Sequence, residues 1–267
     1  MRVDMAGGCL SIPTAFGTAS LIGAAAAFTA AVVNAIAGGG TFIAFPVLNG
    51  VIGMTEKLAN ATCTVGLWPG YAASVAAARQ ELAAIPRAAL RTLVVISVAG
   101  GAVGGAMLLL TPNGLFRTVV PILLGVGTVL FASGPLVNRR FYPDANHDTP
   151  HGVAFPVLFV VAVYNGYFGA GGGVLVMAGL AVCGLNDARR ANIFKMLVQV
   201  TSNAAAVMVL AWSGIAWPIA LGMMPGAIAG GWFGMRLANV MPRGILRAII
   251  IFCGASLTVI YTVKLFR

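Results

Sequence analysis

The chain has 267 residues, of which 60% are hydrophobic and only 8% are charged, and its mean hydropathy is +0.96. Charged residues make up about 25% of a typical soluble domain, so this composition excludes a soluble globular protein and indicates an integral membrane protein in a lipid bilayer. The net charge is +10, but the basic residues lie almost entirely in short connections between apolar runs, which is typical of membrane orientation and not of a nucleic-acid partner.

Ten apolar segments follow one another along the chain, and most reach the ~20 residues that cross a bilayer as a helix. In chain order they cover 15–37, 41–53, 58–78, 90–110, 115–137, 153–169, 174–185, 193–212, 215–235 and 244–263. The sequence therefore predicts an all-α polytopic membrane protein.

The second and seventh segments are shorter than the others, at about 13 residues or ~20 Å of helix, and each follows a triple glycine. An interrupted helix at membrane depth must be buried in protein or line a water-filled cavity, so these runs predict a broken helix in each half. The alternative is that the glycines only let helices pack closely. Segments 41–53 and 174–185 either cross the bilayer or return to the side from which they came.

The second half of the chain repeats features of the first half at a nearly constant distance. The glycine run 38–40 returns at 171–173, and the pair 59–60 returns at 191–192. Asn34, Pro86, the run 99–101 and Arg117 return as Asn165, Pro218, the run 229–231 and Arg247. A duplicated apolar chain with broken helices in matching places is typical of transporters that hold one central site between two repeats.

The basic residues distinguish two arrangements of these halves. In an inverted arrangement ten basic residues face one side and five the other, namely Arg79, Arg87, Arg91, Arg139, Arg140, Arg189, Arg190, Arg236, Arg243 and Arg247 against Arg2, Lys57, Arg117, Lys264 and Arg267. In a parallel arrangement the split would be eight against seven. Because cytoplasmic loops are enriched in Lys and Arg, we expect inverted repeats with both termini outside. The predicted units are a membrane repeat over 1–137, a cytoplasmic linker over 138–151 and a second membrane repeat over 152–267.

Residues that carry enzyme chemistry are scarce. The two histidines, His147 and His151, lie with Asp144 and Asp148 in the linker; a metal cluster there is one interpretation, and an ordinary solvated linker is the favoured one. All six acidic residues fall at segment ends or in connections, which supports neither an aspartyl protease nor a proton relay at mid-membrane. We expect no enzyme activity, no cofactor and no metal.

The polar residues inside the apolar segments are neutral or positive. Lys195 lies near the start of the eighth segment, where a charged side chain costs ~2.5–3.5 kcal/mol and usually faces a cavity or a partner. The alternative is that its long side chain reaches the nearby surface. Asn60 and Thr62 in the third segment, and Asn192 and Gln199 in the eighth, place hydrogen-bonding groups at matching depths.

Each glycine run also predicts a helix N-terminus, which favours anions because its N–H groups are unpaired and partially positive. Two such ends, neutral donors, a lysine and no acid describe a site for a small anion. The predicted substrate-binding residues are Gly38, Gly39, Gly40, Thr41, Asn60, Thr62, Gly171, Gly172, Gly173, Asn192, Lys195 and Gln199.

These motifs resemble those of the TauE/SafE family of membrane proteins along nearly the whole chain. The resemblance rests on the ordered set of runs 37–48, 59–62, 169–173, 191–195 and 226–234. It implies transport, usually export, of sulfur-containing anions such as sulfite, sulfoacetate and other organosulfonates across a bacterial inner membrane. The family often reads Ala-Thr-Ser where this chain has Ala61-Thr62-Cys63, which removes one hydroxyl.

The sequence thus predicts a secondary transporter that exports a small sulfur-containing anion by alternating access. The predicted location is the bacterial inner membrane, with several crossings and both termini in the periplasm. An anion channel and a membrane assembly partner without transport activity are the alternatives. Assembly as a homo-oligomer is compatible with each of these interpretations.

Overall fold

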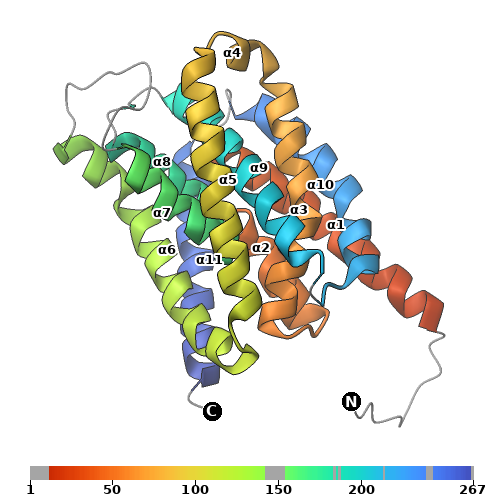
Figure 1. Ribbon diagram of the computed structural model, residues 1–267. Coiled ribbons are helices and arrows are strands. Elements are labelled where there is room, and N and C mark those ends of the chain that lie inside the picture. The colour runs from red at the N-terminus through yellow and green to blue at the C-terminus, as the bar shows by residue number, and fades with distance from the viewer. Residues whose placement is uncertain are drawn as a thin grey trace.

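The structure is a computed structural model that describes residues 12–141, 154–182, 185, 188–212, 214–238 and 243–265, and within these ranges every regular element is a helix (Figure 1). In the first half the helices are α1 (Ile12–Ala37), α2 (Thr41–Pro46), η1 (Val47–Val51), α3 (Glu56–Ala77), α4 (Arg79–Ala83), α5 (Arg87–Leu110) and α6 (Asn113–Phe141). In the second half they are α7 (Ala154–Tyr167), α8 (Gly172–Val182), α9 (Ala188–Leu210), α10 (Trp217–Leu237) and α11 (Arg243–Leu265). The predicted all-α class is confirmed.

Each predicted apolar segment contains a helix, and the structure adds detail in three places. The second segment is divided at Pro46, which has no N–H to donate, and continues as the π-helical turn η1. The short α4 lies in a connection between two predicted segments. α6 runs to Phe141, so residues 138–141 of the predicted linker are helical; they contain no Pro or Gly, and Arg is a good helix former. The rest of the linker, with His147 and His151, lies outside the described residues.

Three helical stretches are long and apolar enough to cross a membrane on their own, namely Gly17–Ala37, Arg87–Leu110 and Arg189–Leu210. Shorter apolar helices cover Thr41–Val51, Asn113–Val129, Phe155–Tyr167 and Gly254–Val263. The stretch Thr41–Val51 reaches only ~16 Å at 1.5 Å per residue, about half of a ~30 Å hydrocarbon core. By length alone it does not cross.

α10 lies between α1 and α3, and glycines allow the close approach. A Cβ on Gly230 would lie 2.3 Å from the carbonyl oxygen of Phe28 in α1. A Cβ on Gly231 would lie 2.1 Å from the carbonyl oxygen of Gly70 in α3. Small residues of this kind let helix backbones touch inside a membrane.

α5 lies between α7 and α9 in the same way. A Cβ on Gly100 would lie 2.9 Å from the carbonyl oxygen of Phe159 in α7, and one on Gly101 would lie 2.1 Å from that of Ser202 in α9. Gly100 and Gly101 are the sequence counterparts of the two glycines on α10. The packing is therefore reciprocal, because each half places one helix between two helices of the other.

The glycine contacts also give the helix directions. Gly222, Gly226, Gly230 and Gly234 of α10 face, in that order, Ser20, Ala24, Phe28 and Val32 of α1, so these helices are parallel. The same progression makes α10 parallel to α3, and α5 parallel to α7 and α9. α3 and α9 are antiparallel, because Trp68 donates to the carbonyl of Val200 while Glu81, after the end of α3, reaches Arg189 at the start of α9.

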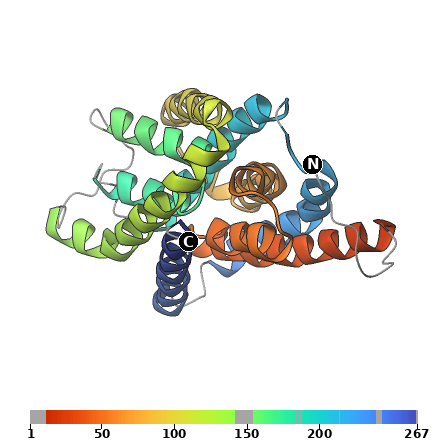
Figure 2. The same ribbon diagram turned by 90° about the horizontal axis from the view of Figure 1, so that it is seen from below.

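The helix directions show whether the short helices cross the bundle or return to the end from which the chain came. Since α1 and α3 are parallel, α2 and η1 bring the chain back to the end at which α1 began. α8 returns along α7, because Gly172 faces Asn165 whereas Gly179 faces Val157 and Val161. Figure 1 shows α4 at the top, and the start of α1 and the end of α11 at the bottom. From below, α3 is seen end-on in the middle of the bundle (Figure 2).

Candidate functional site

The two glycine runs meet at the centre of the molecule. A Cβ on Gly38 would lie 2.7 Å from the backbone of Gly173, and a Cβ on Gly173 would lie 2.7 Å from the Cα of Gly38. The equivalent residues Gly38 and Gly171 have φ angles of +89° and +72°, which only glycine adopts readily. The glycines are therefore required both by the backbone turn and by the contact between the two breaks.

Each break exposes backbone donors at the start of a short helix. Within the described residues, the N–H groups of Gly39, Gly40 and Gly173 have no hydrogen-bond acceptor. This is the state expected of first-turn N–H groups, which have no partner inside their own helix. The Thr41 hydroxyl donates to the carbonyl of Gly169 at 3.3 Å, so the start of α2 contacts the break in the other half.

Lys195 is fully buried and points at the end of α1. Its side chain has 0% exposure, and its Nζ lies 2.8 Å from the carbonyl oxygen of Asn34 and 3.4 Å from that of Ala35. The last carbonyls of a helix lack N–H partners and carry partial negative charge, so a cation is favourable there. Lys195 therefore faces a partner in the interior and does not extend to the surface.

Gln199, one turn further along α9, completes the contact with α1. Its amide and that of Asn34 form a reciprocal pair: Asn34 Nδ2 donates to Gln199 Oε1 at 2.9 Å, and Gln199 Nε2 donates to Asn34 Oδ1 at 3.3 Å. Gln199 Nε2 would lie 3.0 Å from a Cβ on Gly173. Asn34 belongs to this site although the sequence marked it only as a repeated position.

The counterpart of Asn34, Asn165, also bonds to α9. Its Nδ2 donates to Ser202 Oγ at 2.7 Å, and its Oδ1, which is buried without a partner in the described part of the chain, lies against Gly172. Both halves therefore attach the end of their broken helix to the same face of α9. The repetition of Asn34 as Asn165 in the sequence was the signal that could have identified both residues as part of the site.

Asn60 on α3 binds the end of α7. Its Nδ2 donates to the carbonyl of Tyr167, the last residue of α7, at 2.9 Å. Its Oδ1 is buried and lacks a partner among the described residues. Asn60 thus donates to the end of α7 as Lys195 donates to the end of α1. The end of each of these helices is bonded to a side chain from the other half of the chain.

Two predicted residues make their contacts away from the glycine runs, toward opposite ends of α10. Thr62 accepts a hydrogen bond from the N–H of Ala216, just before α10, at 3.4 Å. Asn192 lines a cavity beside α4, at the other end of α10. The structure therefore brings the glycine runs, Thr41, Lys195 and Gln199 together, with Asn60 beside them at the end of α7, and does not bring Thr62 or Asn192 into that group.

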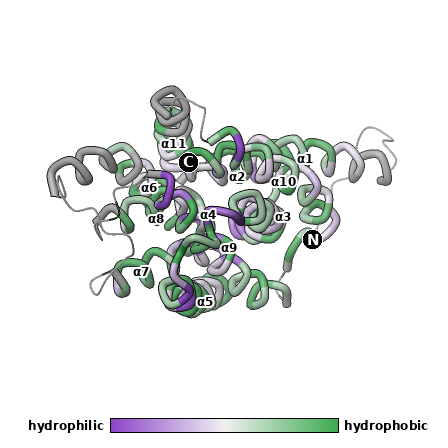
Figure 3. The backbone as a smooth tube through the Cα atoms, turned by 90° about the horizontal axis from the view of Figure 1, so that it is seen from above, coloured by the Kyte–Doolittle hydropathy of each residue, from purple (hydrophilic) through white to green (hydrophobic). Residues whose placement is uncertain are grey.

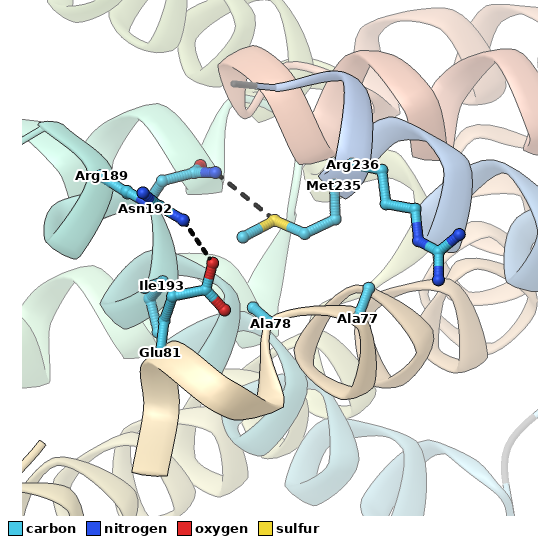
Figure 4. Close-up of a pocket in the computed structure, with 8 residues that line it drawn as sticks. All are labelled: Ala77, Ala78, Glu81, Arg189, Asn192, Ile193, Met235 and Arg236. Carbon is cyan, nitrogen blue, oxygen red and sulfur yellow. Dashed lines mark hydrogen bonds and ion pairs between the residues drawn. The ribbon is translucent and has the colours of Figure 1, made fainter. Parts of the chain in front are cut away.

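The cavity beside α4 has a volume of about 190 Å³ and is lined by Ala77, Ala78, Glu81, Arg189, Asn192, Ile193, Met235 and Arg236 (Figure 4). Arg189 donates to Glu81 at 2.7 Å, and this hydrogen bond lowers the pKa of the Glu81 carboxyl. The guanidinium of Arg236 lies 4.7 Å from the ring centre of Trp232. The sequence used these arginines only as markers of orientation.

One face of α9 connects the cavity with the glycine runs. Asn192, Lys195, Gln199 and Ser202 are spaced as neighbours on one helix face, and their exposures are 6%, 0%, 0% and 0%. The equivalent positions of α3 carry Asn60, Cys63, Leu67 and Gly70. On this face, polar side chains continue along α9, whereas on α3 they end at Asn60. Figure 3, which views the α4 end, shows hydrophilic colour at α4 and mostly hydrophobic colour along the outer helices.

The chain is similar in sequence to a family of sulfite exporters and to a protein described as a probable membrane transporter. The profile of a family described as Sulfite exporter TauE/SafE matches residues 23–261. A protein of Sinorhizobium sp, described as "Probable membrane transporter protein ORF9", is 24% identical over 236 residues, which is 88% of each chain. No solved structure matches the chain. The matched range contains both glycine runs and the polar face of α9.

Proposed function

Because the chain belongs to the TauE/SafE sulfite exporter family, we propose that it exports a small sulfur-containing anion, such as sulfite, sulfoacetate or another organosulfonate, by alternating access. The family and the similar transporter indicate a membrane transporter and not an enzyme. The anionic charge of the proposed substrate rests on the chemistry of the site, whereas its sulfur content and the outward direction follow from the description of the family.

The observation that carries the substrate class is the contact between the two glycine runs. It places unpaired backbone N–H groups of both halves beside a buried lysine, and such groups favour negative charge. Among the side chains whose burial is described, the buried polar residues include no Asp and no Glu. A cation would find no counter-charge here, whereas a small oxyanion would find donors on several sides.

The arrangement proposed for the halves is an inverted repeat. It is supported by the two antiparallel groups of helices, α1, α3 and α10 against α5, α7 and α9, and by equivalent glycines that contact equivalent neighbours. Inverted repeats provide two related conformations, one open to each side, by movement of one half against the other. The α3–α9 contact, where Trp68 bonds to Val200, lies at the middle of this arrangement.

We assign the α4 end to the cytoplasm and both chain termini to the periplasm. Arg79, Arg87, Arg189, Arg190 and Arg236 all lie at or next to the α4 end, which is the positive side expected to face inward. The opposite end holds Lys57, which donates to the carbonyls of Leu109 and Thr111. Labelling of a cysteine added at either terminus in intact cells tests the assignment; two cytoplasmic termini would contradict it.

Lys195 provides the charge for the proposed cycle. In the conformation described here its ammonium group is bonded to the end of α1. When the path opens, an anion at the glycine runs competes with these carbonyls for the ammonium group. Gln199 and Asn60 then supply neutral hydrogen bonds, and departure of the anion returns Lys195 to α1.

Exchange across sealed vesicles tests this function. The purified protein is reconstituted into vesicles loaded with unlabelled sulfite, and entry of labelled sulfite is followed with and without internal sulfite. We expect internal sulfite to accelerate entry and the rate to saturate, because a carrier must bind substrate to return. Sulfoacetate, thiosulfate and sulfate added outside then rank the anions by competition.

The same vesicles distinguish the alternatives. Flux that does not saturate and is indifferent to internal sulfite would indicate a channel. Absence of flux and of binding for all four anions would overturn the proposal and favour a membrane assembly partner. Empty vesicles and vesicles containing Gly38→Val protein serve as controls, since a side chain at Gly38 collides with the opposite break.

A further inference from the structure

Asn165 presents a hydrogen-bond acceptor at the start of α8. Its side chain is 1% exposed, and its Nδ2 donates to Ser202 Oγ at 2.7 Å. Ser202 donates its own hydroxyl proton to the carbonyl of Val198, also at 2.7 Å, so toward Asn165 it can only accept. The orientation of the Asn165 amide is therefore fixed, and its Oδ1 lies on the side opposite the bond to Ser202.

This oxygen lies at the N-terminal end of α8, a helix of 11 residues. A Cβ on Gly172 would lie 2.0 Å from Asn165 Oδ1, so the oxygen faces the space that this glycine leaves empty. The N–H of the next residue, Gly173, has no acceptor among the described residues. Gln199 Nε2 would lie 3.0 Å from a Cβ on Gly173. One acceptor and two donors thus surround the same helix end.

The acceptor distinguishes Asn165 from its counterpart in the first half. Asn34 uses both parts of its amide on Gln199, at 2.9 and 3.3 Å. Asn165 Oδ1 has no partner in the described part of the chain. Since buried acceptors are nearly always paired, this oxygen is expected to meet a donor that another molecule supplies.

The charge of the site gives a second, independent constraint. Among the side chains whose burial is described, Lys195 is the one charged residue in the buried set. One ammonium group balances one negative charge, whereas a dianion would leave net charge buried, which is costly. An oxyanion without a proton would also turn its lone pairs toward those of Asn165 Oδ1.

We propose that the site selects singly charged oxyanions that carry an O–H group, hydrogensulfite in preference to the sulfite dianion, and that Asn165 Oδ1 accepts the hydrogen bond from that O–H. This inference rests on the proposed function and narrows its substrate. The N–H of Gly173 and the ammonium group of Lys195 bind the unprotonated oxygens. Each exported anion then takes one proton with it.

Binding of radiolabelled sulfite to detergent-purified protein tests the selection without requiring transport. Equilibrium dialysis at about pH 6 and about pH 8 covers a range in which sulfite changes from mainly hydrogensulfite to mainly the dianion, whereas Asp, Glu, Lys, Arg and Tyr side chains ordinarily do not titrate. We expect the Kd for total sulfite to rise with pH in proportion to the loss of hydrogensulfite. A Kd that stays constant, or that falls as the pH rises, would overturn the inference.

Methanesulfonate separates titration of the ligand from titration of the protein, because it is a monoanion without an O–H group at both pH values. Its Kd, measured by competition, should be equal at both. The helices packed against α7 are α5, α8 and α9. The charged or titratable side chains of these four helices are Tyr164, Tyr167, Arg87, Arg91, Arg189, Arg190 and Lys195. A Kd for methanesulfonate that changes as much as that for sulfite would assign the pH dependence to the protein and overturn the inference.

Asn165→Leu tests the acceptor itself. The variant removes Oδ1 while keeping a side chain of similar size, and we expect the Kd for sulfite at the lower pH to rise roughly tenfold. The ratio of the Kd values at the two pH values should fall toward one. Ser202→Ala is the matched control, since it breaks the same bond between Asn165 and Ser202 but keeps Oδ1, and it should retain the ratio of the natural protein. An unchanged ratio in Asn165→Leu would remove Asn165 from this role. If that variant does not fold, the measurements on natural protein still decide whether the monoanion is selected.

The outcomes separate this inference from the proposed function. Saturable sulfite exchange in vesicles with a pH-independent Kd would leave the transporter intact and overturn the selection. The expected pH dependence of binding without any exchange would support the selection and contradict transport. A cation is the other partner that an acceptor oxygen can bind, so dialysis is repeated with choline in place of Na⁺. A Kd for sulfite that depends on Na⁺ and not on pH would assign Asn165 to a cation and overturn the inference.

Discussion

α3 and α9 occupy equivalent places in the two halves, yet they differ in what they bring to the centre. α9 carries Lys195, Gln199 and Ser202 at positions where α3 carries Cys63, Leu67 and Gly70. Gly70 contacts α10, and Leu67 is buried in the apolar core. On this face, therefore, α3 has small or apolar side chains after Asn60, whereas α9 continues with a charged and two polar side chains.

The difference extends to the broken helices. Asn34 and Asn165 are themselves equivalent, but both bond to α9, one to Gln199 and the other to Ser202. Asn60 is the side chain from α3 that reaches a broken helix at its last carbonyl. The two halves of the chain therefore have matching backbone breaks, while α9 supplies most of the side chains that bond to the helices ending there.

Replacement of Lys195 by Met should have the largest effect of any change on this face. The variant keeps the volume of the side chain but removes the ammonium group, which makes charge-assisted bonds worth ~1.5–3 kcal/mol. We expect the specific rate of sulfite exchange to fall by about 10- to 100-fold, and the protein still to elute as a folded species from size-exclusion chromatography.

The equivalent position on α3 provides the control for Lys195. Cys63 is buried and makes no ionic contact among the described residues, so Cys63→Ser should leave the exchange rate nearly unchanged. Equal losses in both variants would show that the two helices are not specialised. An unchanged affinity for sulfite in Lys195→Met would remove that residue from the site.

Gln199→Leu gives α9 the residue that α3 carries at the equivalent position, Leu67. We expect its effect on exchange and stability to be smaller than that of Lys195→Met. The buried amide of Asn34 would lose both of its bonds to Gln199, and an unmet buried group costs ~1–3 kcal/mol. We expect a lower thermal unfolding midpoint in detergent together with slower exchange. Leu67→Met at the equivalent place on α3 keeps the apolar volume and should cost less than ~1.5 kcal/mol. A Gln199→Leu protein as stable as the natural one would show that the amide pair contributes nothing.

Ser202→Ala should have a smaller effect than either of these. It removes the acceptor of the 2.7 Å bond from Asn165 Nδ2, and a single hydrogen bond contributes ~1 kcal/mol. Thr201→Ala is the matched control, since among the described residues its hydroxyl bonds carbonyls of its own helix, those of Leu197 and Val198. Unfolding midpoints that fall equally in both variants would assign the loss to helix α9 itself.

Much of this organisation could be predicted from the sequence, because bilayer physics limits the alternatives. The lengths of the apolar runs were enough to predict the helices. The two glycine runs were enough to predict the breaks, since few residues other than glycine adopt the φ angles found at Gly38 and Gly171. The short helices return instead of crossing, as their length of about 11 residues requires.

Side-chain partners were harder to predict. The sequence predicts that Lys195 supplies positive charge to an anion site, but it does not predict that the ammonium group bonds the carbonyls at the end of α1. Both helix ends lie at the same break, and spacing along a chain does not say which of them a long side chain meets. Asn192 was grouped with Gln199 by depth, yet the cavity that it lines forms only when α4, α9 and α10 come together.

The ion pairs at the starts of the two helices give the smallest expected effect. α9 begins with Arg189 bound to Glu81, whereas α3 begins with Glu56 at 4.0 Å from Arg117. The bond from Arg189 holds the pKa of Glu81 below its ordinary value of 4.5. A lowered carboxyl pKa stabilises the folded protein above the ordinary pKa, and this contribution is lost as the pH falls through the lowered value. Because both side chains are partly exposed, we expect the ion pair to contribute less than ~1 kcal/mol to the free energy of unfolding. Unfolding midpoints measured from pH 6 to pH 3 should therefore fall slightly more in natural protein than in Glu81→Gln, with Glu56→Gln as the control from α3. Curves for natural and Glu81→Gln protein that remain parallel over this range would show that the first turn of α9 gains nothing from its partner on α4.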